Sequence, residues 1–183
     1  FAGQPSMQIW YPGDTIQMAI GQKDLQVTPL QLAVAYAAIA NGGSVVTPTV
    51  VRRVQELDGR TALEPTRTRR PRPLGARPET LRVVRDGLYL AANDYNGTSA
   101  AVFAGLPDEV KVAGKTGTAE NPHGADHSWF VGYAPYHDPR IVVAIVVEQG
   151  GQGANAAAPA VCRVIAAYLR FDGSACGSGA RPN

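Results

Sequence analysis

The sequence VKVAGKTGTAE, which runs from Val110 to Glu120, is the most informative stretch of this chain. Valine and lysine alternate at its start, which is the period of two expected of a half-buried strand. From Ala113 onward the residues are small or carry hydroxyl groups, where bulkier side chains would be usual in a strand. We therefore predict a strand over residues 113–120 whose backbone is closely approached by another group.

The KTGT sequence inside this strand predicts a surface that binds anions. In an extended chain Thr116 and Thr118 lie on one face, whereas Lys115 and Gly117 lie on the other. The chain has fourteen arginines but only three lysines, so a lysine at this position is informative. An ammonium group is compact and can shift its pKa when partly buried, which suits a group beside a proton-transfer centre. An exposed lysine on a glycine-containing strand is the alternative, because three-residue matches are common.

Composition and motif content argue against several other classes of protein. The net charge of +2 is too small to indicate a nucleic-acid partner, and no apolar run is long enough to span a membrane. A phosphate-binding loop would need glycine where Glu109 stands. Cys162 and Cys176 lack the spacing of a zinc site, so we expect neither a metal nor a cofactor.

The two cysteines allow two interpretations. Cys162 falls in an apolar helical pattern, which favours a buried free thiol with Cys176 nearby in the tail by chance. A disulfide that pins the tail to this helix is the alternative, and it would require an oxidising compartment.

The remaining sequence predicts an α/β fold, with an antiparallel sheet flanked by helices. Its clearest helix start is Thr28, with Pro29 at the first helical position and Gln31 placed to complete a capping box. That helix has almost no polar face, which predicts burial on most sides. We expect a strand over 14–20, helices over 29–41, 79–92, 98–104 and 154–169, extended chain over 45–55, an Arg/Pro-rich solvated loop over 60–78, strands over 127–134 and 141–148, and a disordered tail over 172–183.

Short links between the last three strands predict an antiparallel meander. Strand 141–148 is apolar on both faces, so we expect it in the interior of the sheet. Strand 113–120 is then left at an open edge, where it should line a cleft.

Several separate stretches together resemble the class B penicillin-binding proteins, most closely those of the penicillin-binding protein 2 type. The similarity covers most of residues 14–170. It is carried by GQ at 21–22, VTPLQ at 27–31 with the alanine-rich helix to Gly43, KTGTAE at 115–120, DHSWFVGYAP at 126–135 and the valine-rich strand ending at Glu148.

The resemblance implies a serine β-lactamase/penicillin-binding-protein-like transpeptidase fold, with residues 1–171 as the C-terminal half of the domain. It also implies a peptidoglycan D,D-transpeptidase that cross-links stem peptides through a serine acyl-enzyme and is acylated by β-lactams. By analogy Lys115 and Thr118 are catalytic. Lys115 would supply positive potential, Gly117 would let the nucleophile-bearing helix approach, and Thr116 and Thr118 would hold the substrate carboxylate. The backbone N–H of Thr118 would form half of the oxyanion hole.

Only one of the three family motifs occurs in this chain. No serine is followed three positions later by lysine, and no S-x-N sequence occurs. Since the chain also begins with Phe1, we expect an upstream segment that carries both motifs and a membrane-anchoring helix.

The resemblance also implies partners and a location. The partners would be a peptidoglycan stem peptide or a β-lactam and, through the full-length parent, a membrane-embedded glycan polymerase of the shape, elongation, division and sporulation family, with no nucleic acid. The location would be the extracytoplasmic face of the bacterial plasma membrane. A D,D-carboxypeptidase, a β-lactam sensor domain and a non-catalytic scaffold with the same fold remain alternatives.

Overall fold

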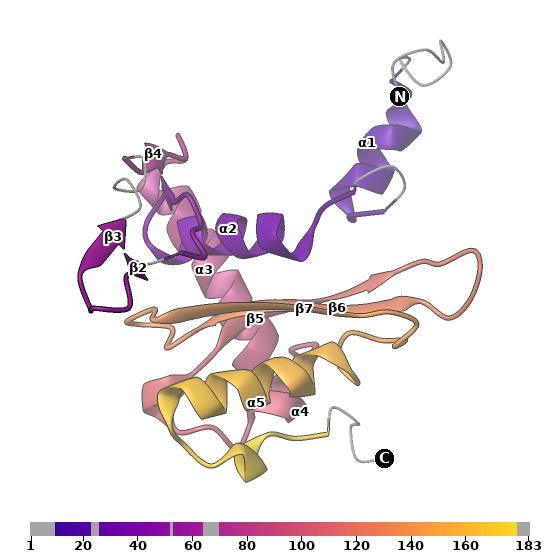
Figure 1. Ribbon diagram of the computed structural model, residues 1–183. Coiled ribbons are helices and arrows are strands. Elements are labelled where there is room, and N and C mark those ends of the chain that lie inside the picture. The colour runs from indigo at the N-terminus through magenta and orange to yellow at the C-terminus, as the bar shows by residue number, and fades with distance from the viewer. Residues whose placement is uncertain (1–9, 23–25, 52, 64–69, 179–183) are drawn as a thin grey trace.

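The computed structural model describes residues 10–22, 26–51, 53–63 and 70–178. In this part of the chain a sheet lies between α2 on one side and α5 on the other, and α1 extends away from the sheet (Figure 1). The helices are α1 (Pro12–Ala19), α2 (Pro29–Ala40), α3 (Pro78–Asn93), α4 (Ala100–Phe103) and α5 (Ala157–Leu169). The strands are β1 (Ser44–Val45), β2 (Val54–Gln55), β3 (Thr61–Leu63), β4 (Arg72–Pro73), β5 (Ala113–Ala119), β6 (His127–Ala134) and β7 (Ile141–Val147), with single 3-10 turns at Asp108–Val110 and Gly173–Ala175.

The central sheet is an antiparallel meander in the order β5-β6-β7. Lys115 lies opposite Val131 and Thr118 lies opposite Ser128, which gives a continuous register along β5 and β6. The predicted α/β fold is confirmed, and so, among the described residues, is the edge position of the strand predicted at 113–120 and observed at Ala113–Ala119. The strand itself begins at Ala113, because residues 108–110 form a 3-10 turn instead of continuing it.

The prediction that the third strand is interior to the sheet is wrong for the described residues, where β7 pairs only with β6. Its apolar residues on both faces have another cause, since α2 packs on one face and α5 on the other. The apolar pattern of a strand shows that both its faces are covered. It does not show whether both its edges are paired with other strands.

The main core lies between the sheet and α5. Phe103 of α4 and Phe130 of β6 meet there with ring centroids 5.3 Å apart, beside the buried Val161 and Ile165 of α5. Gly114 leaves room for this packing, because a Cβ added to it would lie 2.6 Å from the Phe130 ring. A smaller cluster on the α2 side joins Ala40, Leu88, Ala113 and Tyr133.

Helix α2 begins with the predicted capping box. The Thr28 hydroxyl accepts from the Gln31 N–H at 3.2 Å, and the Gln31 side chain accepts from the Thr28 N–H at 2.8 Å. The predicted burial on most sides is wrong, because only Ala38 and Ala40 are buried and Leu30 is 58% exposed. Within the described residues, the sheet covers one side of this helix.

Residues 14–20 do not form the predicted strand, because helix α1 spans most of them. Pro12 occupies the first helical position, and the Asp14 carboxylate accepts from the Tyr11 N–H at 2.8 Å. These start signals favour a helix, and the apolar side chains of Ile16 and Met18 are both exposed on it.

The described parts of the predicted 60–78 loop are partly strand-paired. Strand β3 pairs with β2, and β4 pairs with β1. Residues 64–69 lie outside the described residues, so the expectation of a solvated loop is not tested there.

Cys162 and Cys176 form a disulfide, so the preferred prediction of a free thiol is wrong. The tail is also ordered over residues 172–178, where the Gly177 N–H donates to the Val102 carbonyl at 2.9 Å. Phe171 and Cys176 pack against the main core, which explains why this polar-looking segment is held in place. Residues 179–183 lie outside the described part of the chain. None of the described helices is long and apolar enough to cross a membrane.

Candidate active site

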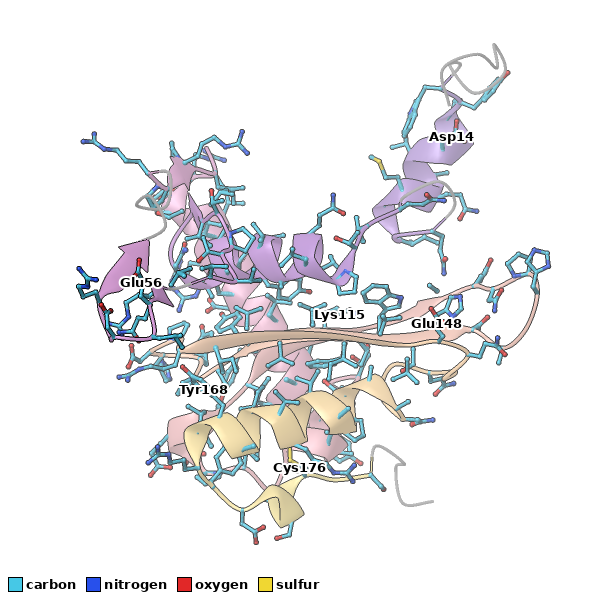
Figure 2. The ribbon with its side chains drawn as sticks, in the orientation of Figure 1. Asp14, Glu56, Lys115, Glu148, Tyr168 and Cys176 are labelled. Atoms are coloured by element: carbon cyan, nitrogen blue, oxygen red, sulfur yellow. A yellow bond between two sulfur atoms is a disulfide. The ribbon has the colours of Figure 1, made fainter. Side chains whose placement is uncertain are left out.

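A groove of about 430 Å³ lies between the sheet and the segment that connects α1 to α2. Residues 115–119 of β5 line it, together with His127, Trp129 and Val131 of β6. The facing wall consists of Ile20, Gly21, Gln26, Val27, Leu32 and Tyr36. Figure 2 shows Lys115 on the α2 side of the sheet, facing this groove. The predicted cleft beside β5 is therefore present.

The outer edge of β5 presents backbone groups to this region. The Lys115 ammonium donates to the Thr116 carbonyl at 2.8 Å, and the Gln22 side chain donates to the Thr118 carbonyl at 3.1 Å. Both carbonyls therefore point away from β6. In an extended strand the N–H and C=O of one residue point the same way, so the N–H groups of Thr116 and Thr118 point to this edge too.

The predicted site residues divide between the two faces of β5. Lys115 and Gly117 lie opposite Val131 and Trp129 on the groove face, whereas Thr116 and Thr118 share the other face. The Lys115 ammonium reaches round the edge to within 3.4 Å of the Thr116 hydroxyl. Lysine and threonine therefore meet at the open edge, while Thr118 lies farther along it.

A third hydroxyl, which sequence reasoning missed, joins this group. The Thr116 hydroxyl donates to the Thr98 hydroxyl at 2.9 Å. Thr98 lies in the turn between α3 and α4 and is exposed. The two threonines are 18 positions apart, and no local pattern relates them.

Two glycines bring the backbone of β5 close to its neighbours. A Cβ added to Gly117 would lie 3.1 Å from the Trp129 Cβ on the groove face. A Cβ added to Gly153, in the connection between β7 and α5, would lie 2.5 Å from the Gly117 carbonyl oxygen and 2.9 Å from its nitrogen. The connection from β7 to α5 therefore lies directly against β5.

Ser128 of β6 holds the connection between β7 and α5 in place. It is fully buried opposite Thr118, and its hydroxyl donates to the Gln152 carbonyl at 3.0 Å and accepts from the Ala157 N–H at 3.1 Å. One buried hydroxyl thus ties β6 to the start of α5.

The electrostatics of the groove favour an anion. Among its described lining residues Lys115 carries the permanent charge, and burial raises the pKa of Tyr36 to about 12, so its phenol stays neutral near pH 7. Within the described ranges, no group of three or more His, Cys, Asp or Glu side chains is arranged to hold a metal ion.

Comparison with known proteins gives matches over most of the chain. Residues 2–166 match the family described as penicillin binding protein transpeptidase domain. The peptidoglycan D,D-transpeptidase MrdA of Haemophilus influenzae is 34% identical over 177 residues, which are 87% of this chain and 26% of that protein.

Two solved structures are similar. Pseudomonas aeruginosa PBP2, in complex with WCK 5153, has a TM-score of 0.76 and 34% identity over 98% of this chain and 38% of that one. The imipenem acyl-enzyme complex of penicillin-binding protein A from M. tuberculosis has a TM-score of 0.69 and 28% identity over 84% of this chain and 33% of that one. The chain therefore spans less than half the length of each of these relatives.

Proposed function

Because the chain belongs to the penicillin-binding protein transpeptidase family, we propose that its full-length protein is a serine D,D-transpeptidase that cross-links peptidoglycan stem peptides. The family membership confirms the resemblance predicted from the KTGTAE and HSWFVGYAP stretches. In this proposal the chain supplies the strand that binds and polarises the substrate. The same strand would bind β-lactams, in keeping with the imipenem acyl-enzyme of the M. tuberculosis relative.

The open edge of β5 is the observation that carries the proposal. The Lys115 ammonium and the Thr116 hydroxyl stand together there, and the N–H of Thr118 points the same way. A substrate carboxylate would be attracted by the ammonium and would accept from the hydroxyls of Thr116 and Thr118. The Thr118 N–H would stabilise the negative oxygen of the tetrahedral intermediate.

The nucleophile must come from elsewhere, because no serine of this chain has the S-x-x-K spacing. We propose that it lies on a segment outside these 183 residues, together with the S-x-N motif. Its hydroxyl oxygen would attack the carbonyl carbon of a D,D-peptide bond, and the amine of the cleaved bond would leave with a proton. The amine of a second stem peptide would then displace the serine from the acyl-enzyme.

The proposed location is the extracytoplasmic face of the bacterial plasma membrane, with the parent anchored by a helix outside this chain. The Cys162–Cys176 disulfide supports this location, because disulfides persist in oxidising compartments. The proposed partner of the full-length protein is a membrane-embedded glycan polymerase of the shape, elongation, division and sporulation family, which the resemblance implies.

Acylation of the full-length protein by a labelled penicillin tests the proposal. Lys115→Ala and Thr118→Val should each lower the acylation rate about tenfold or more, because a hydrogen bond to a charged group contributes about 1.5–3 kcal/mol. Thermal stability should change little, since both side chains are exposed. Lys111→Ala is the matched control. Lys111 donates to the Leu106 carbonyl at 3.2 Å, away from the groove, and its loss should leave the rate unchanged.

Four outcomes test the proposal and its alternatives. Rates within about threefold of the parent for both variants would remove Lys115 and Thr118 from the site, because this corresponds to only ~0.65 kcal/mol. An adduct on a serine of this chain would refute the external nucleophile. Product analysis with stem peptides distinguishes cross-linked dimers from simple release of the terminal residue, and no acylation at all would indicate a scaffold.

A further inference from the structure

Thr98 contacts the active-site strand but is not part of the KTG sequence. Its hydroxyl oxygen lies 2.9 Å from that of Thr116, and the Lys115 ammonium lies 3.4 Å from the same Thr116 oxygen. Thr98 is exposed beside the open edge of β5. Two hydroxyls and an ammonium group from two parts of the chain therefore meet where the proposed function places a carboxylate.

The backbone on both sides of Thr98 is anchored to the last turn of α3. A Cβ added to Gly97 would lie 2.6 Å from the Leu90 carbonyl oxygen and 2.7 Å from that of Ala91, so only glycine fits there. Ser99 is buried, and both its N–H and its hydroxyl donate to the Ala91 carbonyl, at 3.2 and 3.1 Å. The position of Thr98 is thus fixed by contacts on both sides.

The same end of α3 also fixes the start of β5. The Asn93 amide donates to the Tyr89 carbonyl within α3 and to the Val112 carbonyl just before β5, both at 2.8 Å. Because one helix end holds both Thr98 and the entry to β5, the spacing between Thr98 and Thr116 is built into the fold.

The hydrogen-bonding capacity of these groups suggests what the contact does. A threonine hydroxyl has one proton to donate and two lone pairs that accept. Without a ligand, Thr116 donates to Thr98 and accepts from Lys115. An ionised carboxylate only accepts, so Thr116 can bind it only by turning its proton away from Thr98. Thr98 can then donate to the Thr116 oxygen and keep it in place.

We propose that Thr98 is a positioning residue that acts through Thr116: it takes over as the donor of the threonine pair, which frees the Thr116 proton for the ligand carboxylate. This inference rests on the proposed function, since it requires a carboxylate at Thr116. It assigns to the turn between α3 and α4 a part in recognising the acidic end of stem peptides and β-lactams.

The test measures second-order acylation rates of the full-length protein with benzylpenicillin. Thr98→Val keeps the shape of the side chain but removes the donor, and it should lower the rate about three- to tenfold, the effect of one neutral hydrogen bond. Thr98→Ser keeps the hydroxyl and should stay within about twofold of the parent. Thermal unfolding midpoints should be the same for all three proteins, because Thr98 is exposed.

A double-mutant cycle tests the action through Thr116. In a Thr116→Val background, Thr98→Val should change the rate by less than about twofold. An undiminished effect in that background would overturn the proposal, as would a parent-like rate for Thr98→Val alone in a protein that acylates normally. If the parent is not acylated at all, both this inference and the proposed function fail. If Thr98→Val does not fold, Thr98→Ala should show the same loss of rate.

Discussion

Replacing Gly153 with alanine tests whether the connection between β7 and α5 holds β5 in place. The new Cβ would lie 2.5 Å from the Gly117 oxygen and 2.9 Å from its nitrogen, and closer still to the Trp129 oxygen. These are backbone atoms, which cannot rotate away as a flexible side chain can. Gly153 does not have a positive φ that would itself disfavour alanine, so any cost comes from the contact alone.

Overpacking of this kind costs about 1–3 kcal/mol. For a folded unit of about 150–250 residues each 1 kcal/mol corresponds to about 2–4 °C, so about 12 °C is the largest fall in the unfolding midpoint expected for the longer full-length protein. Gly87→Ala is the control with the same chemical change. Gly87 lies inside α3 with no atom within 4 Å of an added Cβ, so alanine there should stabilise the helix by about 0.5–1 kcal/mol. The two substitutions should therefore act in opposite directions.

The assay is thermal unfolding of the full-length protein, followed by penicillin acylation of the same samples. Relief of the contact must move either the connection or β5. If β5 binds the ligand as proposed, a displacement of about 1 Å can cost about 100-fold in rate. Gly153→Ala should therefore lose acylation as well as stability, while Gly87→Ala keeps the parent's rate. A Gly153→Ala protein with the parent's midpoint and rate would show that the connection does not support β5.

Two further predictions concern stability away from the groove. The double variant Cys162→Ala/Cys176→Ala should lower the free energy of unfolding in denaturant titrations by about 3 kcal/mol, because the disulfide closes a loop with a sequence separation of 14. A reducing agent should destabilise the parent by the same amount and leave the double variant unchanged. The Tyr136 hydroxyl donates to Asp86 at 2.5 Å, and this hydrogen bond, followed by burial, raises the pKa of Tyr136 from 10.0 to about 12. The folded state favours the neutral phenol, so the hydrogen bond contributes its full stabilisation below about pH 10 and loses it towards pH 12. The parent should therefore be more stable than Tyr136→Phe below about pH 10, and this difference should shrink between about pH 10 and about pH 12. A difference that does not change with pH would contradict the raised pKa of Tyr136.

Local signals predicted much of the fold. The capping box at Thr28 started α2 as expected, and the HSWFVGYA sequence gave β6 with the predicted bounds of His127–Ala134. In both cases the pattern and the physical cause are local, since a cap is satisfied within one turn and a strand's faces follow from its period of two.

Most of the predictions that failed depended on contacts distant in sequence, although the helix over residues 12–19 has local start signals. Residues 14–20 were expected to form a strand, yet no strand in the described part of the chain pairs with this segment and its capping residues produce a helix. The two cysteines could be paired only by knowing that the tail folds back over α4 and α5. The number of residues between two cysteines does not give the distance between them in the folded chain.

The candidate site shows the same division. The edge position of Lys115 and Thr116 could be predicted from the sequence. The short links predicted the strand order, and the alternation of side chains along a strand predicted which residues share a face. The roles argued for Thr98 and Gly153 depend on a hydroxyl contact and a backbone approach between different elements. Neither residue type is unusual in a turn, so nothing in the sequence distinguished them.

The two edges of the sheet differ in a way that fits the proposed function. An exposed strand edge is a template for pairing with another strand, and lysine is one of the residues that discourages this. Strand β5 carries Lys115 and glycine, and Gln22 occupies the Thr118 carbonyl, whereas β7 (Ile141–Val147) is wholly apolar and has no such protection among the described residues. We therefore expect the β7 edge to be covered by further strands in the full-length protein. Under the proposed function, the β5 edge would be available to an extended peptide, which would bind there as an added strand through the N–H groups of Thr116 and Thr118.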